Sequence, residues 1–241
     1  MRWSHDAWLQ VARLPPGYAD VTISDPPFLA RDGESILARA RSGSAEGHHG
    51  SNEARRRSAE LVGVMTEPQA RILARELLRV TKRWIVLFTT AESIGLWERA
   101  FGSTYVRSGV WVKTNGCPQR SGDRPAQGCE FLVIAHRHHV RKRWNGGGKS
   151  AVYCGPRPYR PMHPCQKPGW LARELVEDFS YPGELVLDPF AGSGVFVIAA
   201  YSMGRKVCWA ERSEVYRERI ADDLRLPLFQ QRALPSLLVN P

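Results

Sequence analysis

The apolar run at residues 83–89 (Arg-Trp-Ile-Val-Leu-Phe-Thr) constrains the fold more than any other stretch of the chain. A strand that is apolar at successive positions is typical of a parallel sheet with helices on both faces. Helical patterns and one stretch rich in turn formers separate further strand patterns, which lie at residues 21–23, 105–113, 130–135, 185–187 and 206–210. This alternation predicts an open, mostly parallel α/β sheet.

The stretch at residues 24–28 (Ser-Asp-Pro-Pro-Phe) follows the first of these strands. Its two prolines end the strand, because they offer no backbone N–H and their φ angle is fixed. The corner therefore presents a carboxylate, free carbonyl groups and the flat ring of Phe28. It suits a planar substrate that carries an amino group, although Asp-Pro-Pro also occurs as an ordinary turn at the end of a strand.

The stretch at residues 184–194 (Glu-Leu-Val-Leu-Asp-Pro-Phe-Ala-Gly-Ser-Gly) is typical of a strand, a tight glycine turn and a helix. The glycines let the backbone approach a ligand closely at the start of that helix. The turn lacks the third glycine of the dinucleotide fingerprint, and it is not followed by the Lys-Ser/Thr of a P-loop. With Phe190 beside the turn, a nucleoside with a small charged tail is the expected ligand.

The ends of three predicted strands carry acidic residues, at Asp25, Asp188 and Glu211. In open α/β sheets, ligands bind beyond the carboxyl ends of the strands. We therefore expect the three carboxylates to lie at one edge of the sheet. Glu211 is placed to accept hydrogen bonds from two ribose hydroxyl groups.

The formal net charge of +10 favours a polyanionic partner such as nucleic acid, the alternative being a merely basic soluble protein. No apolar run approaches the roughly 18 to 20 residues that span a bilayer. The N-terminus lacks the apolar core of a signal peptide, so we expect a cytoplasmic protein without a membrane partner. Five scattered cysteines fit reduced thiols better than a disulfide framework.

Two stretches concentrate the cations. Residues 29–60 have no periodicity and are expected to form a mobile loop that closes on a polyanion through Arg55, Arg56 and Arg57, the alternative being an idle insertion. Residues 136–149 are expected to contact phosphates and stack on a base, the alternative being a solvated basic linker. The residues proposed for these contacts are Arg137, Arg141, Lys142, Arg143 and Trp144. Histidines and cysteines are numerous in this part of the chain, but their spacing predicts no metal site.

Three motifs resemble those of the amino-DNA methyltransferases. Residues 188–194 resemble the S-adenosylmethionine motif of that family, and residues 24–28 resemble its catalytic Asp-Pro-Pro-Tyr/Phe motif. Residues 163–168 (His-Pro-Cys-Gln-Lys-Pro) resemble the His-Pro-x-Gln-Lys-Pro signature that opens the cofactor half. The order of catalytic motif, basic variable region and cofactor half is similar to the β group, and the resemblance covers nearly the whole chain.

The resemblance implies one methyltransferase domain over residues 1–241, with a Rossmann-like seven-stranded sheet that has one antiparallel strand. It further implies a mobile basic loop or insertion at residues 29–66, a short target-recognition region at 136–162 and a cofactor-binding half at 163–226. Family members begin with a strand that ends in Gly-Asp. Here only Ser-His-Asp at residues 4–6 remains, so we expect a truncated edge strand.

The resemblance also assigns roles to residues. The catalytic corner comprises Asp25, Pro26, Pro27 and Phe28. Contacts with S-adenosylmethionine are assigned to Gln166, Lys167, Asp188, Pro189, Phe190, Ala191, Gly192, Ser193, Gly194 and Glu211. Asp25 and the carbonyl group of Pro26 would each accept one N–H of an exocyclic amine, and Phe28 would stack on a base that has left the duplex.

The expected reaction is methylation of adenine N6 in DNA, because Asp at the first motif position is more typical of adenine enzymes and Ser of cytosine-N4 enzymes. Cytosine-N4 methylation, an RNA or protein-glutamine substrate, and a non-catalytic nucleic-acid-binding protein are the alternatives. The resemblance points to a bacterial or phage origin. It leaves open a homodimer and a cognate restriction endonuclease as partners.

Overall fold

The computed structural model describes residues 11–29, 64–116, 118–119, 122–159, 161 and 165–225. The expected remnant of an edge strand at residues 4–6 and most of the expected loop at 29–66 lie outside these ranges. Within them, Phe28–Leu29 (β2) and Val64–Met65 (β3) form a separate parallel pair where that loop begins and ends.

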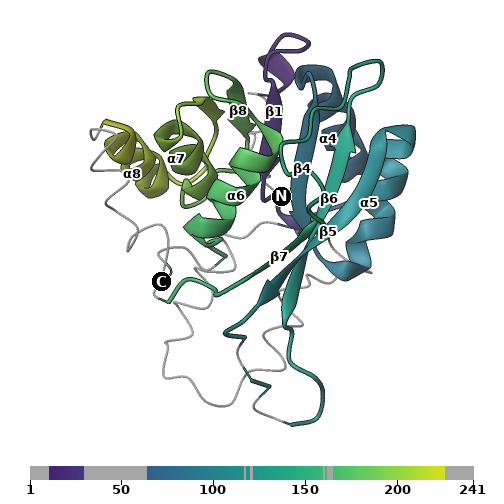
Figure 1. Ribbon diagram of the computed structural model, residues 1–241, viewed down its shortest axis with the longest axis vertical. Coiled ribbons are helices and arrows are strands. Elements are labelled where there is room, and N and C mark those ends of the chain that lie inside the picture. The colour runs from purple at the N-terminus through teal and green to yellow at the C-terminus, as the bar shows by residue number, and fades with distance from the viewer. Residues whose placement is uncertain are drawn as a thin grey trace.

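Seven strands form one sheet in the order β7-β5-β6-β4-β1-β8-β9 (Figure 1). Their bounds are β1 Val21–Ser24, β4 Trp84–Thr89, β5 Tyr105–Lys113, β6 Cys129–His136, β7 Val152–Gly155, β8 Leu185–Asp188 and β9 Lys206–Trp209. Strand β6 is antiparallel to β4 and β5, whereas every other pair in this sheet is parallel. The predicted α/β sheet with one antiparallel strand is confirmed.

Helices cover both faces of the sheet (Figure 1). Their bounds are α4 Glu67–Val80, α5 Ile94–Phe101, α6 Gly169–Phe179, α7 Val195–Ser202 and α8 Glu214–Arg225, with 3₁₀ turns at Ala91–Ser93 and Gly102–Thr104. Helices α4 and α5 pack on one face, α6 and α7 on the other, and α8 contacts α7 through Ile220. None of the described helices has the length and apolar character needed to cross a membrane.

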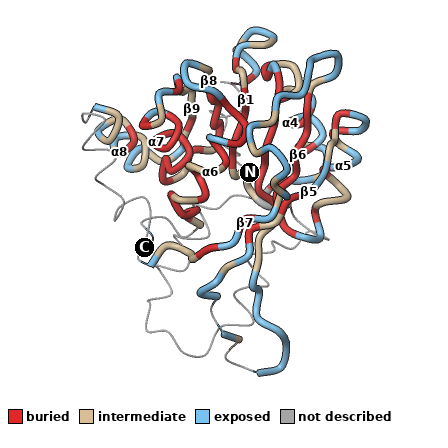
Figure 2. Tube along the Cα trace, in the orientation of Figure 1, coloured by how far each residue is buried: buried red, intermediate tan, exposed pale blue. Residues whose placement is uncertain are grey.

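Strand β4 explains why the sheet is covered twice. Trp84, Val86 and Phe88 point toward α6 and α7, whereas Ile85 and Leu87 point toward α4 and α5. All six residues of the strand are buried, as the apolar run predicts. Figure 2 shows the same arrangement along the chain, with buried residues in the central strands and exposed residues in the loops at both edges.

Strand β7 lies within the region where the sequence predicts a recognition loop. It pairs in parallel with β5, and Tyr153 is only 1% exposed. Its residues alternate between exposed and buried. Four alternating residues between two basic, glycine-rich stretches are too weak a signal for a strand to be predicted.

The strands of the sheet begin and end at two opposite edges. Strands β1, β4, β5 and β8 end at one edge, and β6 begins there. His136 ends β6 opposite Trp84, the first residue of β4, so the segment after β6 starts at the other edge. We call these the carboxyl edge and the far edge.

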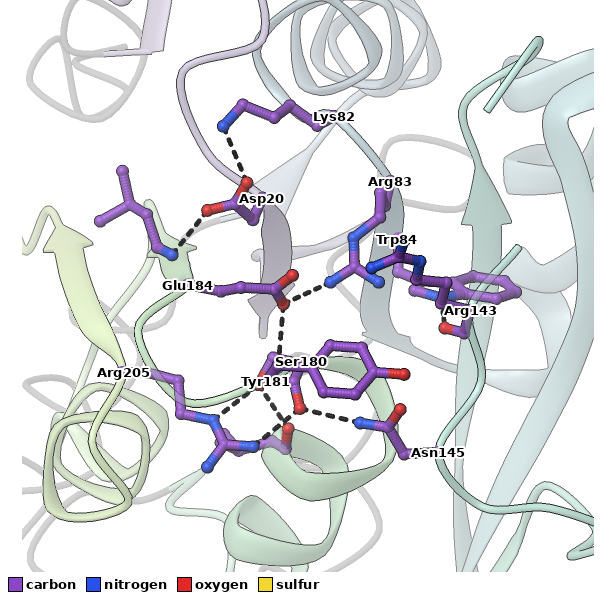
Figure 3. Close-up of polar contacts among 12 residues, drawn as sticks. Asp20, Lys82, Arg83, Trp84, Arg143, Asn145, Ser180, Tyr181, Glu184 and Arg205 are labelled. Atoms are coloured by element: carbon purple, nitrogen blue, oxygen red, sulfur yellow. Dashed lines mark hydrogen bonds and ion pairs between the residues drawn. The ribbon is translucent and has the colours of Figure 1, made fainter. Parts of the chain in front are cut away.

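A polar network stabilises the far edge (Figure 3). Asp20 accepts hydrogen bonds from Lys82 Nζ and from the backbone N–H of Leu185, each 2.8 Å long, and so joins the starts of β1, β4 and β8. Arg83 pairs with Glu184 across the same strands. The far edge therefore holds the parallel strands in register by side-chain contacts as well as by the sheet itself.

Asn145 lies in the same network and ends α6 (Figure 3). Its Nδ2 donates to the carbonyl oxygens of Glu177 at 2.8 Å and Ser180 at 2.9 Å. The last carbonyl groups of a helix have no donor within the helix, so the side chain of Asn145 supplies the missing hydrogen bonds.

We predict that Asn145→Ala lowers the free energy of unfolding by about 1 to 2 kcal/mol, because the helix-end carbonyl group of Glu177 loses its side-chain donor. The carbonyl oxygen of Ser180 loses one of two donors and keeps Arg205 Nη2 at 2.7 Å. Urea denaturation followed by circular dichroism measures the change. Arg141→Ala is the control, since that side chain is exposed and is not part of the network. Equal unfolding midpoints for the two variants would contradict the prediction.

Candidate active site at the carboxyl edge

Asp25 follows β1 directly, and the two prolines after it end the strand as predicted. Its side chain is 17% exposed. One carboxylate oxygen, Oδ2, pairs with the ammonium group of Lys167. The other, Oδ1, is buried and has no hydrogen-bond partner among the described residues. A buried acceptor without a partner is costly, so this atom marks a place where a donor is missing.

Lys167 precedes α6 and is 3% exposed. Besides Asp25, its Nζ contacts the carbonyl oxygen of Cys165 at 3.3 Å and Glu130 Oε2 at 3.2 Å. It lies 4.8 Å from the centre of the Phe88 ring. The flat face of an aromatic ring attracts a cation, which adds to the two carboxylates in keeping this buried ammonium group charged.

The charges around Asp25 act in opposite directions. Burial raises the pKa of Asp25, the positive charge of Lys167 lowers it, and the negative charge of Glu130 raises it again. Burial raises the pKa of Glu130 as well, but Lys167 and Lys113 outweigh this and the pKa lies below its usual value. Burial alone would lower the pKa of Lys167, but Asp25 and Glu130 raise it above its usual range.

Asp188 ends β8 beside Asp25. Its Oδ1 accepts hydrogen bonds from Ser24 Oγ at 2.5 Å and from the backbone N–H of Phe190 at 3.2 Å. Its Oδ2 is buried and has no partner among the described residues. Burial raises the pKa of Asp188 to about 7, and the nearby charges of Asp25 and Glu211 contribute to this shift.

The glycine turn after Asp188 is held by Glu211. The backbone N–H of Gly192 donates to Glu211 Oε2 and that of Ser213 donates to Oε1, both at 2.7 Å. Each carboxylate oxygen keeps a second lone pair, so Glu211 can still accept a hydrogen bond from a ligand hydroxyl. The predicted strand, turn and helix are present, and the acidic residue predicted for ribose stands directly against the turn.

Gly194 has φ +79° and precedes α7. A Cβ atom at this position would lie 2.5 Å from Ile220 Cγ1. The close approach of α8 therefore requires glycine here for space as well as for conformation.

A cavity of about 230 Å³ adjoins the turn. Its walls at β8 and β9 are formed by Leu187, Pro189, Cys208, Trp209 and Ala210. An apolar slot of this kind suits a flat ring. Val11, Arg13 and Leu14 form the remaining wall. Asp188 and Glu211 follow the lining residues Leu187 and Ala210 directly in the sequence.

The structure brings together most of the residues predicted for the site. Asp25, Lys167, Asp188, the turn at 189–194 and Glu211 all lie at the carboxyl edge, and Gln166 is buried next to Lys167. The side chain of Phe28 lies outside the described residues, as do Arg55, Arg56 and Arg57.

Sequence reasoning missed Glu130, Lys113 and the contact that Ser24 makes with Asp188. Glu130 is the second residue of β6, a strand that we expected for its apolar residues alone. The available signal was a charged residue near the end of β5 and another near the start of β6, where Trp111 pairs with Glu130. This signal indicates a site only when the direction of β6 is known.

The basic segment at 137–144 lies at the far edge, away from Asp25, because it follows the far end of β6. Trp144 is half-buried, and base stacking by its ring stays a prediction. The ring packs edge-on against Phe179 at 5.0 Å between centres, and its Nε1 donates to the carbonyl oxygen of Gly147. The backbone carbonyl of Arg143 accepts from Trp84 Nε1 at 2.6 Å. Contacts of Arg137, Arg141, Lys142 and Arg143 with nucleic acid stay a prediction, but a direct contact with the reacting base does not fit this position.

Within the described residues, no group of three or more His, Cys, Asp or Glu side chains is arranged to hold a metal ion.

Comparison with known proteins assigns this chain to a family. The family model described as "DNA methylase", for N6 and N4 methyltransferases, matches residues 136–222. "Putative methylase YubD" of Escherichia coli (strain K12) is 44% identical over 217 residues, which cover 86% of this chain and 82% of that protein. The chain belongs to the N6/N4 DNA methylase family. This confirms the resemblance to amino-DNA methyltransferases.

Two further relatives match this chain over part of their length. "Type II methyltransferase M.XycI" of Xanthomonas campestris pv. cyanopsidis is 30% identical over 146 residues, which are 54% of this chain and 49% of that protein. "Type II methyltransferase M.Cfr9I" of Citrobacter freundii matches over 46% of its length. This chain thus spans about half the length of these two type II methyltransferases.

Solved structures share the fold of this family member. The M1.HpyAVI–SAM complex superposes with a TM-score of 0.64 at 18% identity and covers 91% of this chain and 97% of its own. The PvuII DNA methyltransferase, described as cytosine-N4-specific, superposes with a TM-score of 0.63 at 12% identity and covers 93% and 87%. At these identities the likeness shows the fold alone.

We predict that Gly194→Ala destabilises the protein more than Gly204→Ala does. Both glycines have φ +79°, but a Cβ at Gly204 meets nothing closer than 3.9 Å, whereas one at Gly194 collides with Ile220. The two variants share the backbone strain, so their difference isolates the collision, for which we expect about 1 to 3 kcal/mol. Urea denaturation of both variants provides the measurement, and equal losses would show that α8 moves aside freely.

The raised pKa of Asp188 predicts a pH-dependent stability. Between the usual value of 3.8 and about 7, the folded protein holds a proton that the unfolded chain has released. This group therefore makes the fold less stable as pH rises through that window. Asp188→Asn removes the dependence, so the variant should gain about 2 kcal/mol relative to the unaltered protein between pH 5 and pH 8. Urea denaturation at both pH values measures the gain, and parallel stability curves would contradict it.

Proposed function

We propose that this protein transfers a methyl group from S-adenosylmethionine to the N6 amino group of adenine in DNA. The observation that carries the proposal is the buried Oδ1 of Asp25, an acceptor without a donor beside a nucleoside-type turn. The whole reaction is proposed here, since the chain spans only about half the length of the two type II methyltransferases that it matches.

The cofactor half fits S-adenosylmethionine. The buried, unpartnered Oδ2 of Asp188 offers an acceptor to a polar or cationic group, and Glu211 offers a second acceptor to ribose hydroxyl groups. The apolar cavity beside β8 and β9 suits the adenine ring. When bound, the cofactor supplies a methyl group on a sulfonium centre, which is the electrophile. Metal ions are not part of this proposal.

The residues at the corner act on the amine. The exocyclic nitrogen of a nucleobase is a poor nucleophile, because its lone pair is delocalised into the ring. Asp25 Oδ1 and the carbonyl oxygen of Pro26 each accept one N–H, which pulls the nitrogen toward a tetrahedral shape and frees its lone pair. Methyl transfer would form the N–C bond as the S–C bond breaks, with the electron pair left on sulfur, and the proton that the nitrogen loses would pass to water. The protein contributes placed acceptors and orientation.

Adenine is favoured over cytosine by the acceptor at the first position of the catalytic motif. A carboxylate accepts a hydrogen bond more strongly than a hydroxyl group, and Asp at this position is more typical of adenine enzymes in the family. The hydroxyl group of Ser24 is turned toward Asp188, so it does not replace Asp25 as the acceptor. Cytosine N4 remains the second candidate, because it bears the same kind of amine and a cytosine-N4-specific enzyme shares the fold.

The target base must leave the duplex to reach a corner of this depth. Phe28 is the residue that we propose to stack on it. DNA is the proposed partner, while a homodimer, a cognate restriction endonuclease and a cytoplasmic location stay predictions.

Expression of the protein in cells that lack DNA methylation should produce N6-methyladenine, measured by mass spectrometry of digested DNA. Asp25→Asn should abolish the product while the affinity for S-adenosylmethionine, measured by calorimetry, changes by no more than about threefold, because the carboxylate holds the base.

A rise in N4-methylcytosine without N6-methyladenine would replace adenine by cytosine. Loss of cofactor binding in the Asp25 variant would show that the roles of the two halves are assigned wrongly. Binding of DNA without cofactor affinity in the unaltered protein would support a non-catalytic binding protein.

A further inference from the structure

Four charged side chains of alternating sign meet at the catalytic corner. Asp25 follows β1, Lys167 precedes α6, Glu130 lies in β6 and Lys113 ends β5. Lys167 Nζ pairs with Asp25 Oδ2 and lies 3.2 Å from Glu130 Oε2, while Lys113 Nζ lies 2.8 Å from Glu130 Oε1. All four side chains are at most 22% exposed.

Acceptors surround the ammonium group of Lys167, which has three N–H donors. Its Nζ donates to Asp25 Oδ2 and to the carbonyl oxygen of Cys165. Its charge also pairs with Glu130 Oε2 at 3.2 Å, an atom that has no hydrogen-bond partner among the described residues. The carboxylate of a bound cofactor would therefore compete with Glu130 for the third donor.

We propose that Lys167 and Glu130 are positioning residues for Asp25, which hold Oδ2 away from the substrate so that Oδ1 alone faces the amine. The inference rests on the proposed function, and it moves Lys167 from the cofactor half of the site to the base half. Glu130 holds Lys167 in place from the opposite side, and Lys113 holds Glu130.

The charges explain why such a device is needed. To accept an N–H of the amine, Asp25 must be ionised, because a protonated carboxyl group would present a donor to the same nitrogen. Burial and the negative charge of Glu130 favour the protonated form and raise the pKa of Asp25. Lys167 is the cation in contact with Asp25, whereas Lys113 contacts Glu130.

The test uses two variants that should move the titration of Asp25 in opposite directions. The full-length protein is labelled with ¹³C at the aspartate carboxyl carbon, and the Asp25 signal is identified by its absence in Asp25→Asn. In Lys167→Met the titration midpoint should move up by about one pH unit or more, because the buried carboxylate loses its counter-charge. In Glu130→Gln it should move down, because a like charge is removed.

Lys149→Met is the matched control. Lys149 is also ion-paired, but with Glu174 and Asp178 on α6, so its loss should leave the titration of Asp25 unchanged. If the two test variants shift the midpoint in the same direction, or not at all, the proposal is overturned. If Lys167→Met does not fold, the direction of the shift in Glu130→Gln decides.

Kinetics separate positioning from cofactor binding. In Lys167→Met, kcat for methyl transfer at pH 7 should fall about 100-fold and recover partly at higher pH, with the calorimetric Kd for S-adenosylmethionine within about threefold of the unaltered value. Lys167→Arg should restore part of kcat. A Kd raised more than about tenfold with kcat retained would return Lys167 to the cofactor and overturn the inference. Absence of methyl transfer in the unaltered protein would refute the proposed function, whereas the titration and calorimetry would still decide the role of Lys167.

Discussion

A buried ammonium group keeps its charge only if acceptors surround it, and the carboxyl edge of this sheet is assembled around that requirement at Lys167. The two carboxylates that meet it come from β6 and from the end of β1, which are separated in the sheet by β4. The ring of Phe88, at the end of β4, lies between them. Three strands and the segment before α6 must therefore be in place before Lys167 can pair with Asp25 and Glu130. Formation of the site depends in this way on formation of the sheet.

The far edge also contains ion-paired residues, but there they stabilise the sheet. Asp20, Arg83 and Glu184 are also ion-paired there, but they join the starts of strands and the end of α6, and they leave no buried carboxylate oxygen without a partner. At the carboxyl edge, Asp25, Glu130 and Asp188 each keep one such atom. These carboxylate oxygens mark this edge as the candidate site, because a buried acceptor without a donor lowers stability unless a ligand completes it.

The basic segment after β6 has structural contacts that its charge pattern does not reveal. The ring of Trp144 packs on Phe179, and the side chain of Asn145 bonds to carbonyl groups at the end of α6. Lys149 pairs with Glu174 and Asp178 on the same helix. The direction of one antiparallel strand places this segment at the far edge, and that direction depends on pairing between residues that are far apart in the sequence.

The sequence by itself determined the fold class, the ends of most helices and strands, and the residues of both motifs, because these depend on local periodicity, on proline and glycine geometry and on burial of whole strands. It also placed Asp25, Asp188 and Glu211 at one edge, since parallel strands end together. Only the tertiary structure decided which charges face Asp25. Glu130 and Lys113 are far from Asp25 in the sequence, yet Glu130 pairs with Lys167 beside Asp25, and Lys113 pairs with Glu130. No local pattern encodes that an antiparallel strand will carry Glu130 to the same corner as Lys167.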